Sequence, residues 1–385
     1  MKYWRGYLVG AILLAFTLGF RQIAEANSKL VDMIYPYVTR MVQNFMTNWS
    51  SAATFCVWQA ILVALAIGIL ASIVLMAIFR WNPIQWFGWV VALACAIVLL
   101  HTGIYGMNEF AGPIAEDLRL SEAECSDEQM EAAAIYYRDK ANELSSQVNR
   151  LADGNVQVPT LSGLNEQAVN GFETLIYKEY YSVFAGTRAP VKELGLAELF
   201  TARGQMGCTV AITGEAAINL EAPTVMQPFA VCREMCYRMS IASDRDKHFG
   251  AFLTCQANEN PVFQYAGYVM AYRYCLNELP EAAAKEVAAL ADPAVAKDVA
   301  SWDAFVGQKV ETDPDVDLED LEVKLGLKKA KKKKADTDKE IAELLLRWHH
   351  QEVTVPSQAE PEVRFDPYDE KQVDLTGIAN AKKKK

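Results

Sequence analysis

The chain has 385 residues, enough for one large domain or two ordinary ones, and 52% of them are hydrophobic while only 22% are charged. This balance is too apolar for an ordinary soluble protein and predicts membrane segments. The net charge of -11 argues against nucleic acid as a partner, because a phosphate backbone would be repelled.

Three apolar runs in the first hundred residues predict membrane-spanning helices at about residues 6–20, 52–79 and 84–105. A bilayer core of about 30 Å needs about 20 apolar helical residues, which the last two runs reach easily and the first only marginally. A cleaved signal peptide is the alternative for the first run, because Ala24-Glu25-Ala26 loosely resembles a cleavage site. Residues 1–105 are therefore expected to be a membrane region, with the lipid bilayer as a partner.

Basic residues indicate how these spans are oriented. If Lys2 and Arg5 lie inside, three spans place Arg80 inside as well and put the chain after residue 105 on the outer face. Three basic residues in the segment between the first two spans weaken this bias: Arg21, Lys29 and Arg40. The expected location is the cell membrane, crossed several times, with an extracytoplasmic soluble domain.

Residues 106–310 are expected to form a mainly α-helical domain with a small β element. Ser126 is a candidate N-cap for the first of its helices, with acidic residues in the first turn. The helices are predicted at about residues 126–149, 166–184, 191–200, 228–243, 244–255 and 264–279. Residues 204–220 mix β-branched residues with glycines, which favours one or two short strands with a turn at Thr213-Gly214-Glu215.

From residue 311 the composition changes to an acidic block followed by a basic one, a pattern typical of solvated, flexible chain. Residues 340–353 predict an amphipathic helix that is a candidate to dock back on the domain. Residues 356–385 are expected to be disordered.

The stretch from Pro228 to Cys255 has the frame of a metal-hydrolase helix. Zinc hydrolases with an HExxH motif place two His four residues apart on one helix face, and the intervening Glu activates a metal-bound water. Here Arg233 and Tyr237 are four residues apart, with Glu234 after the first of them. Asp246 follows on the next predicted helix.

Seven short motifs follow one another between about residues 30 and 280. They are Tyr35-Pro36-Tyr37, Tyr105-Gly106-Met107-Asn108, the run TGEAAIN from Thr213 to Asn219, Pro228-Phe229-Ala230-Val231-Cys232, the run REMCY from Arg233 to Tyr237, Asp246-Lys247-His248-Phe249 and Tyr265-Ala266-Gly267-Tyr268. In this order they resemble the bacterial domain of unknown function 3810, a family of membrane-anchored proteins regarded as metallopeptidases. The resemblance implies a zincin-like fold, zinc as the family's cofactor, and metal ligands at positions 233, 237 and 246.

The chain departs from the family at those positions. Arg233 and Tyr237 replace both His, and Asp246 stands where the family has Glu. A guanidinium has no lone pair for a metal and would repel Zn²⁺. Without the ion Glu234, at the general-base position, does not activate water. We therefore expect an inactive pseudopeptidase without a bound cofactor, in which Arg233 either pairs with Glu234 or Asp246 or points to solvent.

A second metal-ligand set is an alternative, and it would keep the chain an active zinc metallopeptidase. Thiolates bind zinc well, and Cys232, Cys236, His248 and Cys255 lie on the same two helices. Buried free thiols or disulfides are the competing interpretation, and the spacing of the cysteines does not choose between them.

The resemblance also implies a peptide-binding cleft. The strand carrying Thr213, Gly214, Glu215 and Asn219 would form its edge and bind an extended peptide by strand addition. A turn acid and a capping Asn are the alternative. The expected role is therefore to bind a peptide or envelope partner or to act as a scaffold, with a structural membrane anchor without a cleft as the other possibility.

Overall fold

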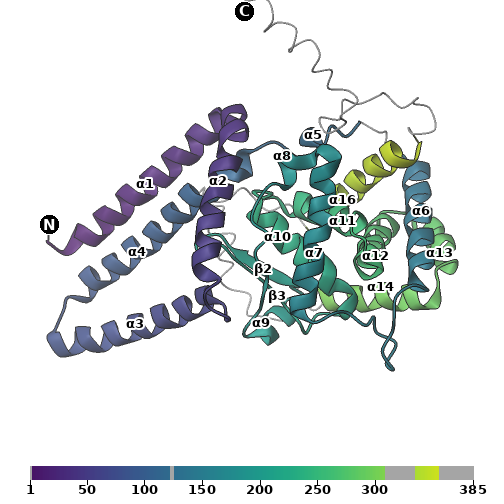
Figure 1. Cartoon of the computed structure of the whole chain (residues 1–385). Coiled ribbons are helices and arrows are strands. Elements are labelled where there is room, and N and C mark those ends of the chain that lie inside the picture. Colours follow the sequence, from purple (N-terminus) through teal and green to yellow (C-terminus); the bar gives the residue numbers. More distant parts are fainter. Residues whose placement is uncertain (1, 122–124, 308–333, 355–385) are drawn as a thin grey trace, which may run out of the picture.

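The computed structural model describes residues 2–121, 125–307 and 334–354 (Figure 1). The described chain is mainly α-helical and contains one small sheet. Long N-terminal helices extend from one side of a helical domain (Figure 1). The charged blocks at 311–333 and the predicted disorder of residues 356–385 lie outside the described residues.

Three helices are long and apolar enough to cross a membrane: α1 (Arg5–Ala26), α3 (Val57–Phe79) and α4 (Pro83–Ile104). The three predicted spans are thereby confirmed as helices, and the first is longer than the marginal run that the sequence indicated. Helices α1 and α4 pack side by side, whereas α3 diverges from α4 (Figure 1). All residues of α3 are exposed or half-buried, as expected of a helix surrounded by lipid.

The segment between the first two spans is a continuous helix, α2 (Ser28–Ser50), although Pro36 lies inside it. Helix α2 lies between the membrane helices and the domain and crosses the direction of α1 and α4 (Figure 1). The Tyr35 hydroxyl donates to the carbonyls of Thr102 (3.0 Å) and Gly103 (2.9 Å), which fixes α2 to the end of α4.

The domain core is built from helices packed around α11 and α12. After a 3-10 turn, η2 (Gly106–Phe110), the helices are α5 (Ile114–Asp117), α6 (Asp127–Ser145), α7 (Leu161–Leu175), α8 (Tyr181–Phe184), α9 (Ala197–Thr201), α10 (Gln227–Arg238), α11 (Asp244–Gln256), α12 (Pro261–Asn277), α13 (Glu281–Ala289) and α14 (Pro293–Val306). Helix α12 packs against α6, and α11 against α10. Buried aromatic side chains such as Phe229, Phe249 and Phe252 fill the space between them.

Local signals placed most of these helices correctly. The Ser126 hydroxyl accepts from the Gln129 N–H (3.3 Å), so the predicted cap of α6 is confirmed. The predicted helix at 191–200 is wrong: it is replaced by a two-residue strand, β1 (Lys192–Glu193), and the short α9. Leu196 has a positive φ of 53°, which a continuous right-handed helix cannot contain.

The sheet has the order β1-β3-β2. Strand β2 (Gly207–Val210) pairs antiparallel with β3 (Glu215–Ile218), and β1 pairs parallel with β3. Gly214, in the predicted turn, has a φ of 66°, a conformation that suits glycine. The predicted hairpin is thereby confirmed, and β3 is the central strand.

The last described helix, α16 (Lys334–His349), continues into a π-helical turn, η5 (His350–Thr354). It packs on α6, α11 and α12 and buries Ile341, Leu344 and Leu345. The Tyr137 hydroxyl donates to the Leu345 carbonyl (2.8 Å). The predicted docking of this amphipathic helix on the domain is therefore confirmed.

Candidate functional site

Helices α10 and α11 carry Arg233, Glu234, Tyr237 and Asp246 and form a tightly packed pair. Pro228 in the first turn of α10 suits a position where the helix needs no N–H donor. The helix ends before Ser240, whose φ is 71°, and the chain turns back. The Ser243 hydroxyl then accepts from the Asp246 N–H (3.0 Å) and caps α11. This short reversal fixes which residues of the two helices face each other.

The Arg233 guanidinium lies between acidic groups of both helices. Its Nη1 donates to Glu234 Oε1, and its Nη2 lies 3.5 Å from Asp244 Oδ1. Burial would raise the pKa of Asp244, but Lys247 and Arg233 outweigh it and hold that pKa well below its ordinary value. The expected pairing of Arg233 with Glu234 is observed, whereas its second partner is Asp244 rather than Asp246.

The Glu234 carboxylate is held from a second side by the sheet. It is only 2% exposed, and its Oε2 accepts from the Thr209 hydroxyl (2.7 Å) of β2. A charged carboxylate at this depth needs a cation and hydrogen bonds to offset its lost hydration. Arg233 and Thr209 supply both, so the carboxylate that we predicted at a general-base position is engaged in structural contacts.

Tyr237 is packed by an aromatic ring and a cation. Its ring stacks on Tyr105 with centroids 4.0 Å apart, and the Tyr105 hydroxyl donates to its carbonyl (2.7 Å). The Lys247 ammonium lies 5.0 Å from the ring centroid. Burial raises the pKa of the phenol, so it stays protonated. Tyr237 therefore joins α10 to the residue that ends the membrane helix α4.

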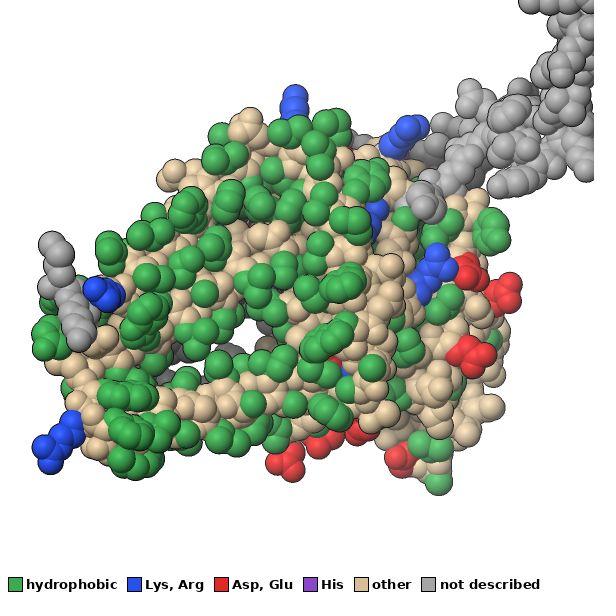
Figure 2. All heavy atoms as spheres, turned by 60° about the vertical axis from the view of Figure 1, so that its left-hand side comes forward, with side chains coloured by type: hydrophobic (Ala, Val, Ile, Leu, Met, Phe, Trp, Pro, Cys, Tyr) green, Lys and Arg blue, Asp and Glu red, His purple; other side chains and the backbone are tan. Residues whose placement is uncertain are grey.

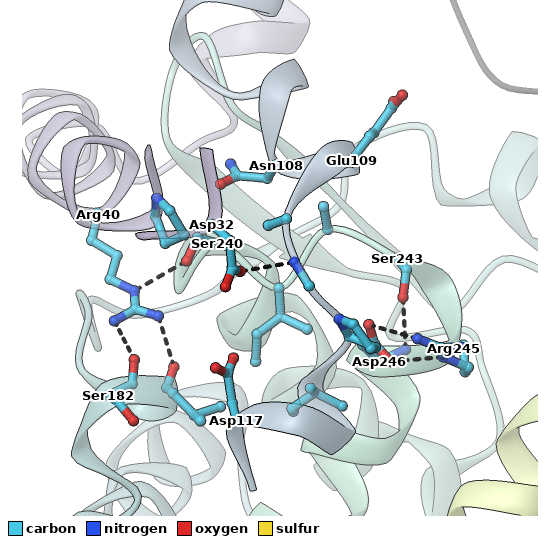
Figure 3. Close-up of a pocket in the computed structure, with 18 of the residues that line it drawn as sticks. Asp32, Arg40, Asn108, Glu109, Asp117, Ser182, Ser240, Ser243, Arg245 and Asp246 are labelled. Carbon is cyan, nitrogen blue, oxygen red and sulfur yellow. Dashed lines mark hydrogen bonds and ion pairs between the residues drawn. The ribbon is translucent and has the colours of Figure 1, made fainter. Parts of the chain in front are cut away.

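The Asp246 side chain does not contact Arg233 and instead lies at a cavity. Its carboxylate pairs with Arg245 (2.8 Å) and lines a cavity of about 610 Å³ between the domain and α2 (Figure 3). Asp32 and Asp117 face each other across this cavity (Figure 3). Burial and then the Asp32 charge raise the pKa of Asp117.

The residues that we placed at expected metal-ligand positions do not fit a zinc ion. Arg233 has no lone pair to give, Tyr237 is a stacked neutral phenol, and Asp246 is bound to Arg245 at the cavity. Zinc in a hydrolytic site needs three protein ligands around one open position. Within the described ranges, no group of three or more His, Cys, Asp or Glu side chains is placed to hold a metal ion.

The alternative Cys and His set is not assembled either. The Cys232 thiol neighbours Cys255, while Cys236 neighbours the side chain of Thr254. Burial raises the pKa of both Cys232 and Cys236, which favours thiols over metal-binding thiolates. His248 Nδ1 lies 2.6 Å from the Asp244 carbonyl. All eight cysteines are unbridged.

The strand predicted as a cleft edge is the centre of the sheet. Strand β3 has partners on both sides, so it has no free edge for a peptide, and the prediction is corrected. Thr213, Glu215 and Asn219 are all buried. The Asn219 amide donates to the Thr201 hydroxyl (2.8 Å), and Gly214 packs against Thr47 of α2. The TGEAAIN run is thus a structural junction.

Glu215 makes the most notable contact of this junction. Its two carboxylate oxygens accept from the N–H groups of Val57 and Trp58, each at 2.8 Å, and so cap the first turn of the span α3. Lys192 pairs with the same carboxylate (2.6 Å). One indirect signal of this contact is visible in the sequence: the residue before Val57 is a Cys, which is a poor N-cap.

Arg40 of α2 is a second residue that sequence patterns missed. Its guanidinium donates to the carbonyls of Met239 (2.9 Å), Ser182 (2.6 Å) and Val183 (3.2 Å), at the wall of the cavity (Figure 3). These acceptors are backbone atoms far away in the sequence. No side-chain pattern in the sequence predicts these contacts.

Comparison with known proteins identifies a family but no function. The family model described as "Protein of unknown function (DUF3810)" matches residues 31–318, which is more than half of the chain. No curated protein and no solved structure matches the chain.

Proposed function

Since this chain belongs to the family of proteins of unknown function DUF3810, we propose that it is a membrane-anchored, catalytically inactive pseudopeptidase that serves as a binding module or scaffold. The observation that carries this proposal is the position of Arg233, whose guanidinium contacts acidic groups of both α10 and α11. A fixed positive charge replaces the link that a metal ion would provide between two such helices.

The cavity beside Asp246 is the proposed place of binding. Its volume of about 610 Å³ falls in the range of small-molecule and short-peptide sites. It brings together charged side chains from α2, α5 and α11, among them Asp32, Asp117 and Arg245. A peptide or another envelope component with positive groups fits this lining best, because its carboxylates outnumber its guanidinium groups.

A structural membrane anchor is the second candidate function. It is favoured by the contacts of the hairpin with α2 and α3, where Glu215 caps a span and Thr47 donates to the Gly214 carbonyl (2.8 Å). Such contacts fix the domain to its membrane helices without providing a cleft.

We also propose that the domain lies on the outer face of the cell membrane. Arg21 pairs with Glu109 (3.2 Å) and Arg40 is bound by domain carbonyls. Both are therefore poor orientation signals, which leaves Lys29 on the side of the domain against Lys2, Arg5 and Arg80 at the opposite ends of the spans. Cys125 is exposed, so labelling of whole cells with a membrane-impermeant maleimide tests this orientation.

The decisive experiment for inactivity measures zinc and peptide hydrolysis in the detergent-purified full chain. We expect no stoichiometric zinc and no hydrolysis that a chelator abolishes. The variant Arg233→His with Tyr237→His is the comparison, since it restores the two missing imidazoles. One equivalent of tightly held zinc in the wild type would overturn the proposal. If Cys232→Ser or His248→Asn removed that zinc, the rearranged ligand set would be the correct account.

Binding is separated from anchoring by photo-crosslinking in cells. A benzoylphenylalanine at Ala242, in the cavity wall, is compared with one at Glu286, exposed on the distant α13. Adducts with one peptide or envelope protein from position 242 alone would support the binding module. Equal patterns from both positions would favour the anchor.

A further inference from the structure

Helix α2 is amphipathic in the opposite sense to a helix of a soluble domain. Its buried stripe is polar, and its exposed stripe is apolar. We infer that α2 lies along the surface layer of the bilayer, with its apolar stripe among the lipid acyl chains and its polar stripe bound to the domain. This inference does not depend on whether the protein is an enzyme.

The polar stripe consists of residues three or four positions apart: Thr39, Gln43, Thr47 and Ser50. The Gln43 amide donates to the Ala211 carbonyl (2.9 Å), and Thr47 donates to that of Gly214 (2.8 Å). Arg40 adds its contacts with the far side of the domain. The domain therefore occupies this side of α2, and the opposite stripe must face away from it.

The apolar stripe recurs with helical period on that opposite side. Its large hydrophobic side chains are between 41% and 70% exposed. They are Met33, Ile34, Tyr37, Val38, Met41, Phe45 and Trp49. The helix is described throughout, and this stripe contains no charged residue. An uncharged apolar surface of this length is a binding surface for lipid or protein, because soluble proteins rarely leave one open to water.

The neighbours of α2 in the chain select lipid as the occupant. One residue separates α2 from the span α1, and six separate it from the span α3. Both ends of a helix about 35 Å long are therefore held at the boundary of the bilayer. Figure 2 shows that apolar side chains cover the membrane helices on the face turned forward, with few charges among them. The stripe of α2 thus continues the surface that already faces lipid.

The aromatic residues of the stripe agree with a position of α2 in the surface layer of the bilayer. Tyr37 lies near the middle of α2 and Trp49 at its C-terminal end, and both residue types are enriched at the membrane–water interface. The cavity lies along the flank of the same helix, through Asp32, Pro36, Tyr37 and Arg40, so Tyr37 borders both the apolar stripe and the cavity. It therefore lies at the level of the lipid headgroups.

Photoreactive lipid tests the inference on the wild-type chain. The full protein is placed in nanodiscs of phosphatidylcholine with a diazirine on the acyl chain, irradiated and mapped by peptide mass spectrometry. We expect adducts on residues 33–49 and on α3, and none on α13. Labelling of α3 without labelling of α2 would overturn the inference.

Spin labels measure the depth and identify a competing occupant. In a Cys125→Ser background, Met41→Cys and Phe45→Cys carry the nitroxide, and Glu198→Cys on α9 is the aqueous control. We expect the two α2 positions to be relaxed more by oxygen than by a water-soluble nickel chelate, and the control to show the reverse. Chelate access at α2 would contradict the inference. Dipolar broadening between labels, with neither reagent admitted, would instead assign the stripe to a second copy of the chain.

Discussion

Two buried carboxylates, Glu234 on α10 and Glu215 at the membrane junction, are each 2% exposed and each paired with one cation. Their hydrogen-bond partners differ. Glu234 accepts from a side chain of the domain, whereas Glu215 accepts from two backbone N–H groups of a membrane span.

The difference concerns what each carboxylate connects. Glu234, with Arg233, ties α10 to β2 and α11 inside one compact domain. Glu215, with Lys192, ties the sheet to α3, a helix with few other contacts to the domain. The junction has fewer alternative contacts than the α10–α11 pair. Loss of the Glu215 carboxylate should therefore lower the free energy of unfolding more than loss of the Glu234 contacts.

The largest effect is expected from Glu215→Gln. It removes the counter-charge of the largely buried Lys192 ammonium and weakens the cap of α3. Breaking a buried ion pair in this way lowers the free energy of unfolding by about 3–5 kcal/mol. Denaturant unfolding of the full chain in nanodiscs measures it. Glu193→Gln, an exposed neighbour on β1, is the control and should change little. Equal effects of the two variants would show that the junction contributes no special stability.

Arg233→Ala comes next. The Glu234 carboxylate is left buried without a cation, although Thr209 still donates to it. We expect a loss of about 2–4 kcal/mol, and partial recovery when Glu234→Gln is added, because the second change removes the uncompensated charge. Arg188→Ala breaks a more exposed pair with Glu173 and should cost under about 1 kcal/mol. An unchanged melting temperature for Arg233→Ala would refute the role of Arg233 in joining the helices.

Arg40→Ala tests the contact between α2 and the far side of the domain. The guanidinium donates to three carbonyls in different directions, a geometry that an ammonium cannot match. We expect a loss of about 2 kcal/mol that Arg40→Lys does not restore. Lys29→Ala, an exposed change on the same helix, serves as the control. The loss should also make the link at residues 51–56 more sensitive to limited proteolysis, and an intact link would argue against this contact.

The smallest effect is a dependence of stability on pH. Burial, and then the Arg233 charge, lower the pKa of His248 from 6.5 to about 3. The unfolded chain therefore takes up a proton below pH 6.5 that the folded chain refuses until about pH 3. The free energy of unfolding should fall with decreasing pH in this window, by up to about 1.4 kcal/mol per pH unit. Unfolding at pH 7, 6 and 5 measures the slope.

The control for this slope is His248→Asn, which keeps a donor for the Asp244 carbonyl but does not titrate. It should flatten the dependence between pH 6.5 and 5, whereas His350→Gln, outside the α10–α11 pair, should not. A slope that survives His248→Asn would assign the acid sensitivity to other groups.

Elements with local signals were predictable from the sequence. The spans follow from uninterrupted apolar runs, the β2–β3 hairpin from glycines among β-branched residues, and α6 from the cap at Ser126. Helix α2 was not predictable in this way, because Pro36 and scattered polar residues suggest a link between two spans. Its hydrophobic residues follow a helical period because lipid lies on one side of the helix and the domain on the other.

In the candidate site, local sequence signals likewise could not predict every contact between single residues. Sequence spacing correctly placed Arg233 beside Glu234, which are adjacent in the chain. It offered Asp246 as the alternative partner on the next helix, but the turn at Ser240 and the cap at Ser243 bring Asp244 to the guanidinium instead. A shift of two residues rotates a helix position by more than half a turn, so spacing alone could not decide it.

By itself, the sequence determined that this protein enters the membrane, that its domain is helical with one hairpin, and that positions 233 and 237 hold no histidine. These properties depend on composition, short-range periodicity and side-chain chemistry. Only the tertiary structure decided that Glu215 caps a span, that Tyr237 stacks on Tyr105, and that α2 turns its apolar stripe away from the domain. Each of these depends on contacts between residues that lie far apart in the chain, and the packing of whole elements, rather than local pattern, fixes such contacts.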